Sequence, residues 1–441
     1  MKQTKTVAIA SEHYKMTDVD MTYFTYLKYN NTVDYYSQGY GSQFLSYFGI
    51  DTSLPLSQQQ YVGSVTWRDH CAGEAEETVK QYLVLCETAY EAGVTLNDED
   101  RAAIEKTLQS VRDSAGSSGM SVDDFVTARY GKGVSLAHMK KCCEIAALAD
   151  KYRQILYDGP TYGTADLQAY YDAHKKDFDF VDYRSYTFNA EYGRDATENE
   201  KAAAIEKAKD DAGKFLAALQ RGGDFVDLVL KIEPDLTRKE ADRVTLRRDA
   251  QYAEGDTGNW LFDDETAVGD VTKFDDYECV TVYQMVTGRH RDDYKTVDVG
   301  HVYFYAAEAD LDSDIFKEEA DKFLAEFKKG EMTAARLEEM ASSGNYTYAI
   351  YNGKLEQVCK VRDDVTDGWL FDPARKANDA EVLVSELNGV NLFLYLKEND
   401  TAWEIRVEAA KRNEDYKARY AALAAEHPVK VDEEVMRKVA A

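Results

Sequence analysis

The chain has 441 residues, of which 44% are hydrophobic and 12% aromatic, a composition typical of folded domains and not of a disordered protein. Its 53 Lys and Arg stand against 81 Asp and Glu, and the resulting net charge of −28 disfavours nucleic acid and anionic lipid as partners. No apolar run reaches the roughly 18 residues that a membrane-spanning helix needs, and the length predicts roughly two to four domains.

The N-terminal segment predicts a strand at residues 6–10 with almost no sequence before it. We therefore expect that an export signal or membrane anchor precedes Lys2 in the full-length protein and is absent from this chain. If so, the protein works outside the cytoplasmic membrane, at the cell surface or held to the membrane, and contacts the membrane only through that anchor.

Residues 14–180 carry a helical pattern. Aromatic side chains, including Tyr23 and Tyr26, recur at helical spacing in residues 21–29, and a long helix is predicted over residues 65–92 with Gly93 as its terminator. Further helix starts are predicted at Asn97 or Asp98, at Ser121 and at Ser135, where a polar cap precedes an amphipathic run. A short helix over residues 164–174 leads into a strand.

From residue 181 onward the chain contains an internal duplication. A strand at 181–190, a helix that ends at Gly222–Gly223, a short helix, the phrase WLFD at 260–263 and a strand at 279–286 all recur. Their counterparts are the strand 297–306, a helix ending at Lys329–Gly330, WLFD at 369–372 and the strand 390–396. Matching residues stand about 110 positions apart, which is the size of a domain.

The tail predicts a charged amphipathic helix at 402–425, ended by His427–Pro428, and a short strand at 429–431 that pairs with the strand at 6–10. The predicted organisation is therefore a helical domain at residues 1–180, module 1 at 181–295, module 2 at 296–400, and a C-terminal segment at 401–441 that packs back on the helical domain. The predicted fold class is α+β.

Three stretches carry a family resemblance. The segment NDEDRAAIEKTLQSVRDSAGSSGMSVDDFVTARYGKGVSLAHMKKCCE resembles the helical domain of SurA-type and PrsA-type extracytoplasmic foldases. The segment TADLQAYYDAHKKDFDFVDYRSYTF resembles the exit from that domain into a parvulin (rotamase) module, and FLAALQRGGDFVDLV resembles the parvulin helix pair. The resemblance implies a SurA-like N-terminal domain, completed by the C-terminal helix, and two tandem parvulin-like β-α-α-β modules.

Parvulins are peptidyl-prolyl isomerases, which lower a rotation barrier of about 20 kcal/mol by placing polar groups around a twisted amide. The resemblance implies one histidine in the first strand and another in the closing strand of each module. The first position is Ser185 in module 1 and His301 in module 2, while the closing strands, YECVTVYQMV and NGVNLFLYL, contain no histidine. The modules are thus predicted to be inactive or weak, with His301 as the candidate catalytic residue; a hydrogen-bonded strand histidine is the structural alternative.

The candidate peptide-binding residues are aromatic. The chain contains 32 tyrosines, and Tyr offers a large contact area with little loss of side-chain freedom, although it also fills partly wet cores. The candidates in the two predicted binding regions are Tyr303, Trp369, Phe371, Tyr23 and Tyr26. The repeated WLFD phrase is predicted to fix a short helix onto each sheet, with Asp270 or Asp379 turning the chain toward the closing strand.

The sequence predicts no cofactor and no metal. The six cysteines form no CxxC pair, and His138 with Cys142 on one helix face supplies only two ligands. Asp310, Asp312 and Asp314 resemble the opening of a calcium loop, but the required glycine is replaced by Ile315.

The predicted function is a chaperone or foldase that binds unfolded or newly exported polypeptides outside the cytoplasmic membrane. One alternative is an active peptidyl-prolyl isomerase centred on His301 of module 2. Another is a surface scaffold that binds one dedicated protein partner. An isomerase assay on proline peptides distinguishes the active isomerase from the chaperone. Aggregation assays on unrelated unfolded clients distinguish the scaffold for one partner from a general chaperone.

Overall fold

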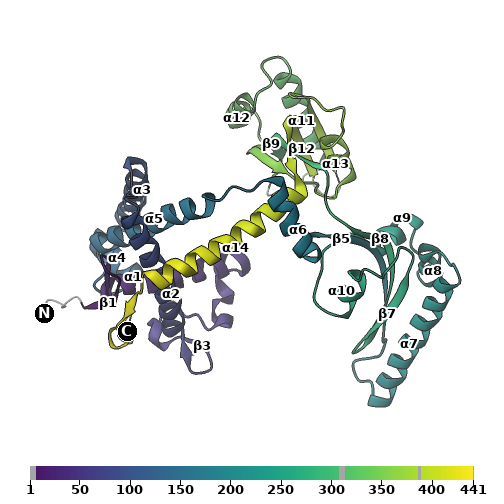
Figure 1. Cartoon of the computed structure of the whole chain (residues 1–441), viewed down its shortest axis with the longest axis horizontal. Coiled ribbons are helices and arrows are strands. Elements are labelled where there is room, and N and C mark those ends of the chain that lie inside the picture. Colours follow the sequence, from purple (N-terminus) through teal and green to yellow (C-terminus); the bar gives the residue numbers. More distant parts are fainter. Residues whose placement is uncertain (1–5, 307–312, 386–388, 441) are drawn as a thin grey trace. The chain divides into compact units, whose positions relative to one another are not determined.

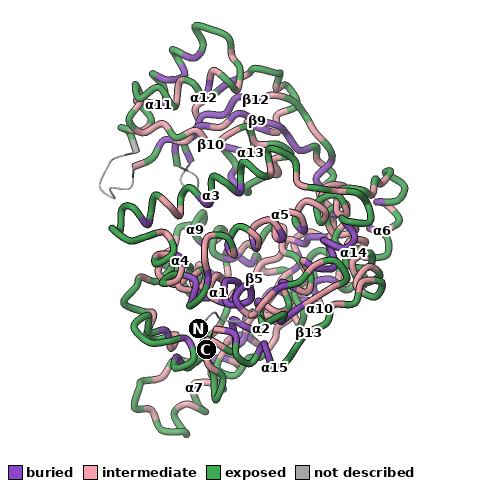
Figure 2. The backbone as a smooth tube through the Cα atoms, turned by 90° about the vertical axis from the view of Figure 1, so that its left-hand side faces the viewer, coloured by how far each residue is buried: buried purple, intermediate pink, exposed green. Residues whose placement is uncertain are grey.

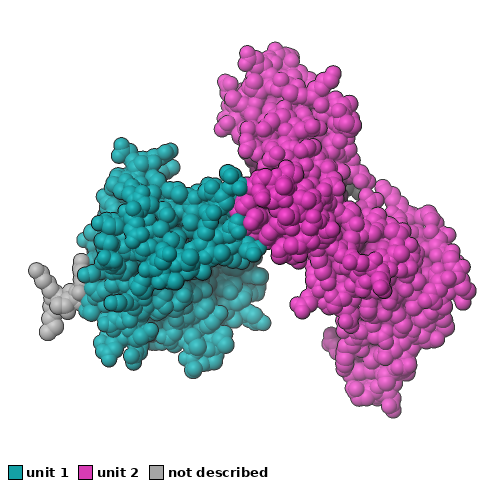
Figure 3. Space-filling model, viewed as in Figure 1, with its two compact units in different colours: residues 1–161, 412–441 teal, residues 162–411 magenta. Residues whose placement is uncertain are grey.

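The computed structural model describes residues 6–306, 313–385 and 389–440, and the chain combines helices with antiparallel sheets (Figure 1). It divides into two compact units (Figure 3): unit 1 comprises Met1–Thr161 and Arg412–Ala441, and unit 2 comprises Tyr162–Lys411. The expected helical domain ended at residue 180, whereas this division assigns residues 162–180 to unit 2. No helix among the described residues is both long and apolar enough to cross a membrane.

Unit 1 is largely helical. Its elements are β1 (Val7–Ala10), β2 (Lys15–Thr17), α1 (Asp18–Tyr40), the 3-10 helices η1 (Ser42–Phe48) and η2 (Leu56–Gln58), β3 (Gln60–Val62), β4 (Val65–Thr66), α2 (Trp67–Glu91), α3 (Asp98–Ser117), α4 (Val122–Tyr130), α5 (Leu136–Asp158), the second half of α14 (Ala402–Glu426), β13 (Lys430–Val431) and α15 (Glu433–Met436). Asn97, Ser121 and Ser135 are the N-caps of α3, α4 and α5, which confirms the predicted helix starts.

The two ends of the chain meet in one small sheet of order β13-β1-β2. Ile9 lies opposite Val431 and Ala10 opposite Lys430 in an antiparallel ladder, so the predicted pairing of the first and last strands is confirmed. Ile9 is fully buried in the same core as Met21 of α1 and Leu83 of α2. The C-terminal segment therefore completes the core of unit 1.

Unit 2 begins with α6 (Thr164–Phe178) and contains both modules. Module 1 consists of β5 (Phe180–Asn189), α7 (Glu198–Gln220), α8 (Phe225–Ile232), α9 (Arg238–Thr245), β6 (Leu246–Ala250), α10 (Asp256–Leu261), β7 (Val271–Asp276) and β8 (Cys279–His290). Module 2 consists of β9 (Lys295–Phe304), α11 (Ser313–Phe327), α12 (Ala334–Ser342), β10 (Ala349–Val358), α13 (Asp364–Leu370), β11 (Ala380–Ser385) and β12 (Gly389–Thr401).

The two modules share one topology, with sheet orders β6-β5-β8-β7 and β10-β9-β12-β11. Each sheet thus has four strands, where the sequence predicted only the two central ones. The missed strands lie at the sheet edges, and they are short or rich in polar residues, as in LRRDA of β6. An edge strand is partly solvated and does not need the apolar alternation that identifies a central strand.

In module 2 both faces of the sheet are covered, so the central strands are buried over most of residues 296–304 of β9 and 390–395 of β12, as the purple stretches in Figure 2 show. The central strands of module 1, β5 and β8, are mostly half-buried. In module 2, Val302 and Leu392 face the core formed with α11 and α12, while Val299 and Phe393 face α13. This alternation follows from the two-residue period of a strand. It places every second residue of β9, including position 301, on the α13 face.

The WLFD phrases end α10 and α13, as predicted. Leu261 and Leu370 are the buried residues through which these helices pack on their sheets. In both copies the first Asp of the turn accepts a hydrogen bond at 2.9 Å from the backbone N–H two residues later. Asp270 and Asp379 each accept one at 2.9 Å from the N–H three residues earlier. The repeated phrase therefore encodes a repeated helix-and-turn.

Candidate functional site

His301 lies in the middle of β9, opposite Phe393 of β12 and Gly353 of β10. Its ring stacks on that of Phe393 with centroids 4.6 Å apart and planes 5° apart. Because residues of one parity share one face of a strand, His301 points to the same side as α13 and its WLFD phrase. The fold thus brings three predicted site residues, His301, Trp369 and Phe371, to one face of module 2.

Both ring nitrogens of His301 have partners. Nε2 lies 2.9 Å from Oδ1 of Asn391, and Nδ1 lies 3.1 Å from Nδ2 of Asn352. With the two amides oriented in this way, the amide oxygen can only accept, so Nε2 carries the proton, while Nδ1 accepts from Asn352. Burial lowers the pKa of His301 below its ordinary value, and the hydrogen bond to Asn391 offsets part of that effect. The ring is therefore neutral at neutral pH.

Asn391 supplies the partner of His301 on the closing strand. β12 opens with Gly389, Val390 and Asn391, and the side chain of Asn391 meets Nε2 of His301. An asparagine at this position keeps a hydrogen bond to His301 but cannot exchange a proton near neutral pH. The sequence analysis missed Asn391; an amide side chain within the otherwise apolar stretch VNLFLYL is the signal that could have identified it.

Module 1 has no imidazole at the corresponding place. Ser185, the counterpart of His301, lies opposite Tyr283 on β8. The cross-strand pair Tyr303–Asn391 of module 2 corresponds to Thr187 and Thr281, whose hydroxyl oxygens are 2.9 Å apart. Where module 2 has the His301 ring, this part of module 1 therefore offers hydroxyl groups.

The aromatic candidates of module 2 are half-buried. The guanidinium of Arg375 lies over the Trp369 ring, with Cζ of Arg375 4.4 Å from the ring centroid. Phe371 packs edge-on against Tyr294, with ring centroids 5.3 Å apart. Tyr303 stacks on Tyr305 at 5.9 Å. Each of these rings already contacts another side chain of unit 2, so part of its surface is covered.

In unit 1, Tyr23 is a core residue. Its side chain is 4% exposed, its ring packs against Tyr130 at 5.1 Å, and its hydroxyl lies 3.9 Å from Sγ of Cys143. Tyr26 is half-buried against the same core. A bound polypeptide does not reach Tyr23 in this structure, because the first half of α1 is the half that packs against α2 and α5.

The exposed aromatic residues of unit 1 lie further along the chain, where α1 extends past the core and η1 folds back on it. Tyr47 is 86% exposed and Tyr35 is 68% exposed. Ring contacts join five residues into a continuous surface that we call the aromatic ridge: Tyr35, Tyr36, Tyr40, Tyr47 and Phe48.

The aromatic ridge has a fixed base. Tyr36 and Phe48 stack at 4.1 Å with planes 10° apart, and both pack on a small buried cluster that contains Ile50, Leu56 and Trp67. Nε1 of Trp67 donates to the backbone oxygen of Phe48 at 3.2 Å. The exposed rings therefore contact two half-buried rings that are themselves packed on a buried cluster.

Module 1 carries a second candidate surface, a groove of about 900 Å³ between β5 and α7. Its apolar floor includes Tyr186, Phe188 and Phe215, whose rings contact one another at 5.0 to 6.0 Å. Its rim carries three lysines and three acidic residues: Lys207, Lys214, Lys231, Glu191, Asp211 and Glu233. An apolar floor within a balanced rim suits a short polypeptide segment of mixed sequence.

The metal patterns considered in the sequence do not assemble into a site in the described part of the chain. Nδ1 of His138 lies 2.8 Å from the Ser135 hydroxyl at the start of α5, and Sγ of Cys142 lies 3.9 Å from the backbone oxygen of Asp20. Asp310 and Asp312 lie outside the described residues.

No family model matches this chain, and no curated protein matches it by sequence. Among solved structures it is similar to the crystal structure of the foldase protein PrsA from Lactococcus lactis, with 12% sequence identity and a TM-score of 0.20. That similarity covers 78% of this chain and 94% of the other. Identity and score at this level carry neither a family nor an activity to this chain.

Proposed function

We propose that the protein is a foldase-type chaperone that binds unfolded or newly exported polypeptides outside the cytoplasmic membrane. In this proposal unit 1 is a SurA-like domain closed by the C-terminal segment, and the two modules are parvulin-like. The observation that carries the proposal is the aromatic ridge, a continuous row of rings on a strongly acidic protein, in which Tyr35, Tyr40 and Tyr47 are exposed. Contiguous exposed apolar surface marks an interaction site, and the net charge keeps a chain with such a surface soluble.

The ridge favours many weak contacts over one tight one. Tyr and Phe bind apolar side chains through their faces and backbone amides through the ring edge or hydroxyl, so they tolerate varied client sequences. The groove of module 1 supplies a second surface of similar character. Two weak sites on one chain hold an extended client more firmly than either does alone.

We propose further that the modules have lost isomerase activity or retain little of it. Module 1 has Ser185 in place of a histidine, and in module 2 the closing-strand partner of His301 is Asn391 and not a histidine. Because both nitrogens of His301 already have partners, a substrate amide gains no hydrogen bond from this ring unless one asparagine turns away. The alternative, an active isomerase, predicts measurable turnover of a proline peptide that His301→Ala removes.

The ridge is tested with aggregation assays on two unrelated unfolded clients. The wild-type chain is expected to suppress aggregation of both, and the double variant Tyr35→Ser/Tyr47→Ser is expected to need several times more protein for the same effect. Tyr277→Ser is the matched control, because Tyr277 is 85% exposed but belongs to the β7–β8 turn of module 1. Equal suppression by all three proteins excludes the ridge as a client site.

The same assay separates the remaining alternative, a scaffold for one dedicated partner. A scaffold leaves both unrelated clients to aggregate at the rate seen without the protein. A general chaperone protects both, with a loss in the double variant that is similar for the two clients.

A further inference from the structure

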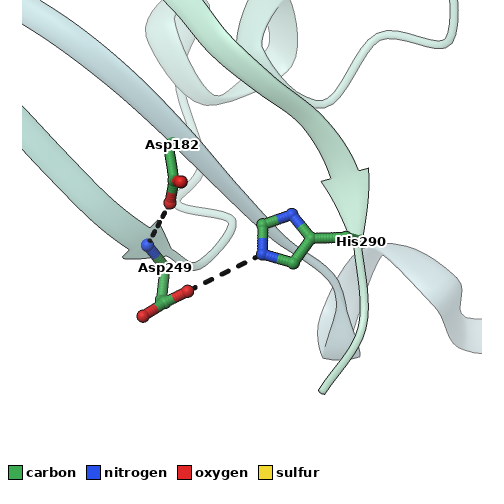
Figure 4. Close-up of side chains that lie close together, drawn as sticks. All are labelled: Asp182, Asp249 and His290. Atoms are coloured by element: carbon green, nitrogen blue, oxygen red, sulfur yellow. Dashed lines mark hydrogen bonds and ion pairs between the residues drawn. The ribbon is translucent and has the colours of Figure 1, made fainter. Parts of the chain in front are cut away.

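We propose that Asp182, Asp249 and His290 of module 1 bind a divalent transition-metal cation of the zinc class. The three side chains come from β5, the end of β6 and the end of β8, and they converge at one end of the sheet (Figure 4). One ligand atom of each lies within 4.8 Å of the other two. Asp182 and Asp249 stand 67 positions apart, so no local spacing in the sequence indicates this site.

The backbone places both carboxylates. Asp182 sits where the pairing register of β5 shifts on both of its sides, its N–H donates to Oγ1 of Thr287 at 2.9 Å, and its Oδ1 accepts from the N–H of Asp249 at 2.7 Å. Asp249 has a φ of 46°, a left-handed conformation that Asp tolerates better than most residues. This conformation turns the Asp249 carboxylate toward His290, as Figure 4 shows.

His290 turns its Nε2 toward that carboxylate. Its Nδ1 lies 3.0 Å from the backbone oxygen of Gly288, which can only accept, so Nδ1 carries a proton. In the neutral ring Nε2 is then unprotonated, and it faces Oδ1 of Asp249. A histidine whose second nitrogen donates to a backbone carbonyl is the usual arrangement of a metal ligand.

The spacing of these two atoms also fits a bridging metal ion. Nε2 of His290 and Oδ1 of Asp249 are 3.6 Å apart, a distance that suits an ion pair but is too long for a hydrogen bond. Tetrahedral zinc has bonds of about 2.0 to 2.1 Å to nitrogen and oxygen, which puts neighbouring ligands about 3.4 Å apart. A zinc ion fits this gap with a small side-chain movement, and Asp182 supplies the third ligand.

The ligand set selects the metal. One imidazole and two carboxylates suit Zn²⁺, Ni²⁺ or Cu²⁺, whereas Ca²⁺ requires six to eight oxygen atoms. A cavity of about 630 Å³ beside the three residues gives a path for entry and room for a bound water. Six aspartates and five Arg or Lys residues line that cavity, so binding must come from the ligand bonds and not from a strongly negative field.

Arg362 of module 2 competes with a metal ion for the Asp249 carboxylate. Its Nε lies 3.3 Å from Oδ2 of Asp249, and its guanidinium also donates to the Asp249 backbone oxygen at 2.8 Å. It leaves Oδ1 facing His290 but lowers the electron density that the carboxylate can give to a metal. A bound cation would join β6, a five-residue edge strand, to β5 and β8 and so stabilise module 1.

The experiment is a calorimetric titration of the full chain with Zn²⁺, repeated with Co²⁺ for its absorption spectrum. Wild type is expected to bind one equivalent, and His290→Ala and Asp249→Asn are each expected to bind at least about tenfold more weakly. His174→Ala is the matched control: Nδ1 of His174 lies 3.6 Å from Asp177, but among the described residues the pair belongs to no group of three possible ligands, so this variant should bind as wild type does. Arg362→Ala should bind more tightly than wild type.

Three results overturn the proposal: no saturable binding of Zn²⁺ below millimolar concentration, equal affinity in wild type and both ligand variants, or a Co²⁺ spectrum with a thiolate charge-transfer band. The last result assigns the metal to cysteine. Circular dichroism checks that the variants fold. If a ligand variant does not fold, tighter binding by Arg362→Ala together with a thiolate-free Co²⁺ spectrum supports the site, and unchanged affinity in Arg362→Ala contradicts it.

Discussion

Replacing Leu370 by Ala tests whether the second WLFD phrase is a packing element. Leu370 ends α13, is 1% exposed and packs in one cluster with Val297, Val299 and Phe393. Truncating a buried Leu to Ala removes its apolar contacts and leaves a cavity, at a cost of 2.7 to 5.0 kcal/mol in a well-packed core, a range taken from another protein. Taking about 3 kcal/mol, the equilibrium for opening module 2 rises roughly a hundredfold.

Hydrogen exchange followed by mass spectrometry measures this effect strand by strand. In Leu370→Ala, peptides from β9 and β12 are expected to exchange roughly a hundredfold faster, because they form the sheet that Leu370 covers. Peptides from β5 and β8 should not change, since Leu261 fills the corresponding place in module 1. Val365→Ala is the control: Val365 lies on the same helix but is 46% exposed, and its loss should alter the free energy by less than about 0.5 kcal/mol.

Leu370 is not a packing residue if Leu370→Ala leaves hydrogen exchange in β9 and β12 as in wild type but weakens client binding. The phrase would then be a binding element that happens to be covered, and its repetition would mark two binding sites. Faster exchange in Val365→Ala, at a rate similar to that of Leu370→Ala, would likewise show that the whole helix, and not the buried Leu370 side chain, controls the module.

Three further predictions concern titratable groups. The Glu87 carboxylate accepts from both N and Nδ1 of His13 at 2.7 Å, and this contact raises the pKa of His13. Burial alone would raise the pKa of Glu87, but hydrogen bonds from Ser11 and His13 lower it. The pair therefore stabilises unit 1 most between the unfolded values of about 4.5 and 6.5, and the melting temperature of Glu87→Gln should fall furthest below wild type there and approach it toward pH 8. Burial lowers the pKa of His301, so its stabilising contribution is present above about pH 6.5 and is lost as the pH falls further; His301→Gln should show a smaller loss of stability between pH 7 and 5 than wild type. Burial also raises the pKa of the Cys86 thiol to about 12, so a thiol reagent should label the half-exposed Cys279 in the folded protein and Cys86 only after unfolding, whereas equal rates would contradict the packing of α2.

Some parts of the candidate site could be predicted because they depend on one strand at a time. The strand pattern of residues 297–306 identifies His301 as a strand residue, and the duplication identifies Ser185 as its counterpart in module 1. The partners of His301 were not predicted. Asn352 and Asn391 lie on neighbouring strands, and which asparagine meets the ring depends on the pairing register, which sequence periodicity leaves open.

Exposure was the least predictable property. Tyr23 and Tyr35 both belong to α1, and both occur in aromatic-rich stretches that a periodicity analysis treats alike. Tyr23 is buried because α2 and α5 cover the first half of the helix, whereas Tyr35 lies past their contact and stays in solvent. Whether an aromatic residue is core or binding surface is decided by what packs against its helix.

By itself the sequence determined the elements that local rules control: the helix starts at polar caps, the central strands and the repeated helix-and-turn of WLFD. These depend on side chains within a few positions of one another, or on a repeat that is visible in the letters. The pairing of the two chain ends was predicted as well, from a short strand pattern at each end. Tertiary structure alone decided the edge strands, the aromatic ridge and the convergence of Asp182, Asp249 and His290. Such features arise from groups far apart in the chain, whose distances are fixed only when the sheets have paired in register and the helices have covered them.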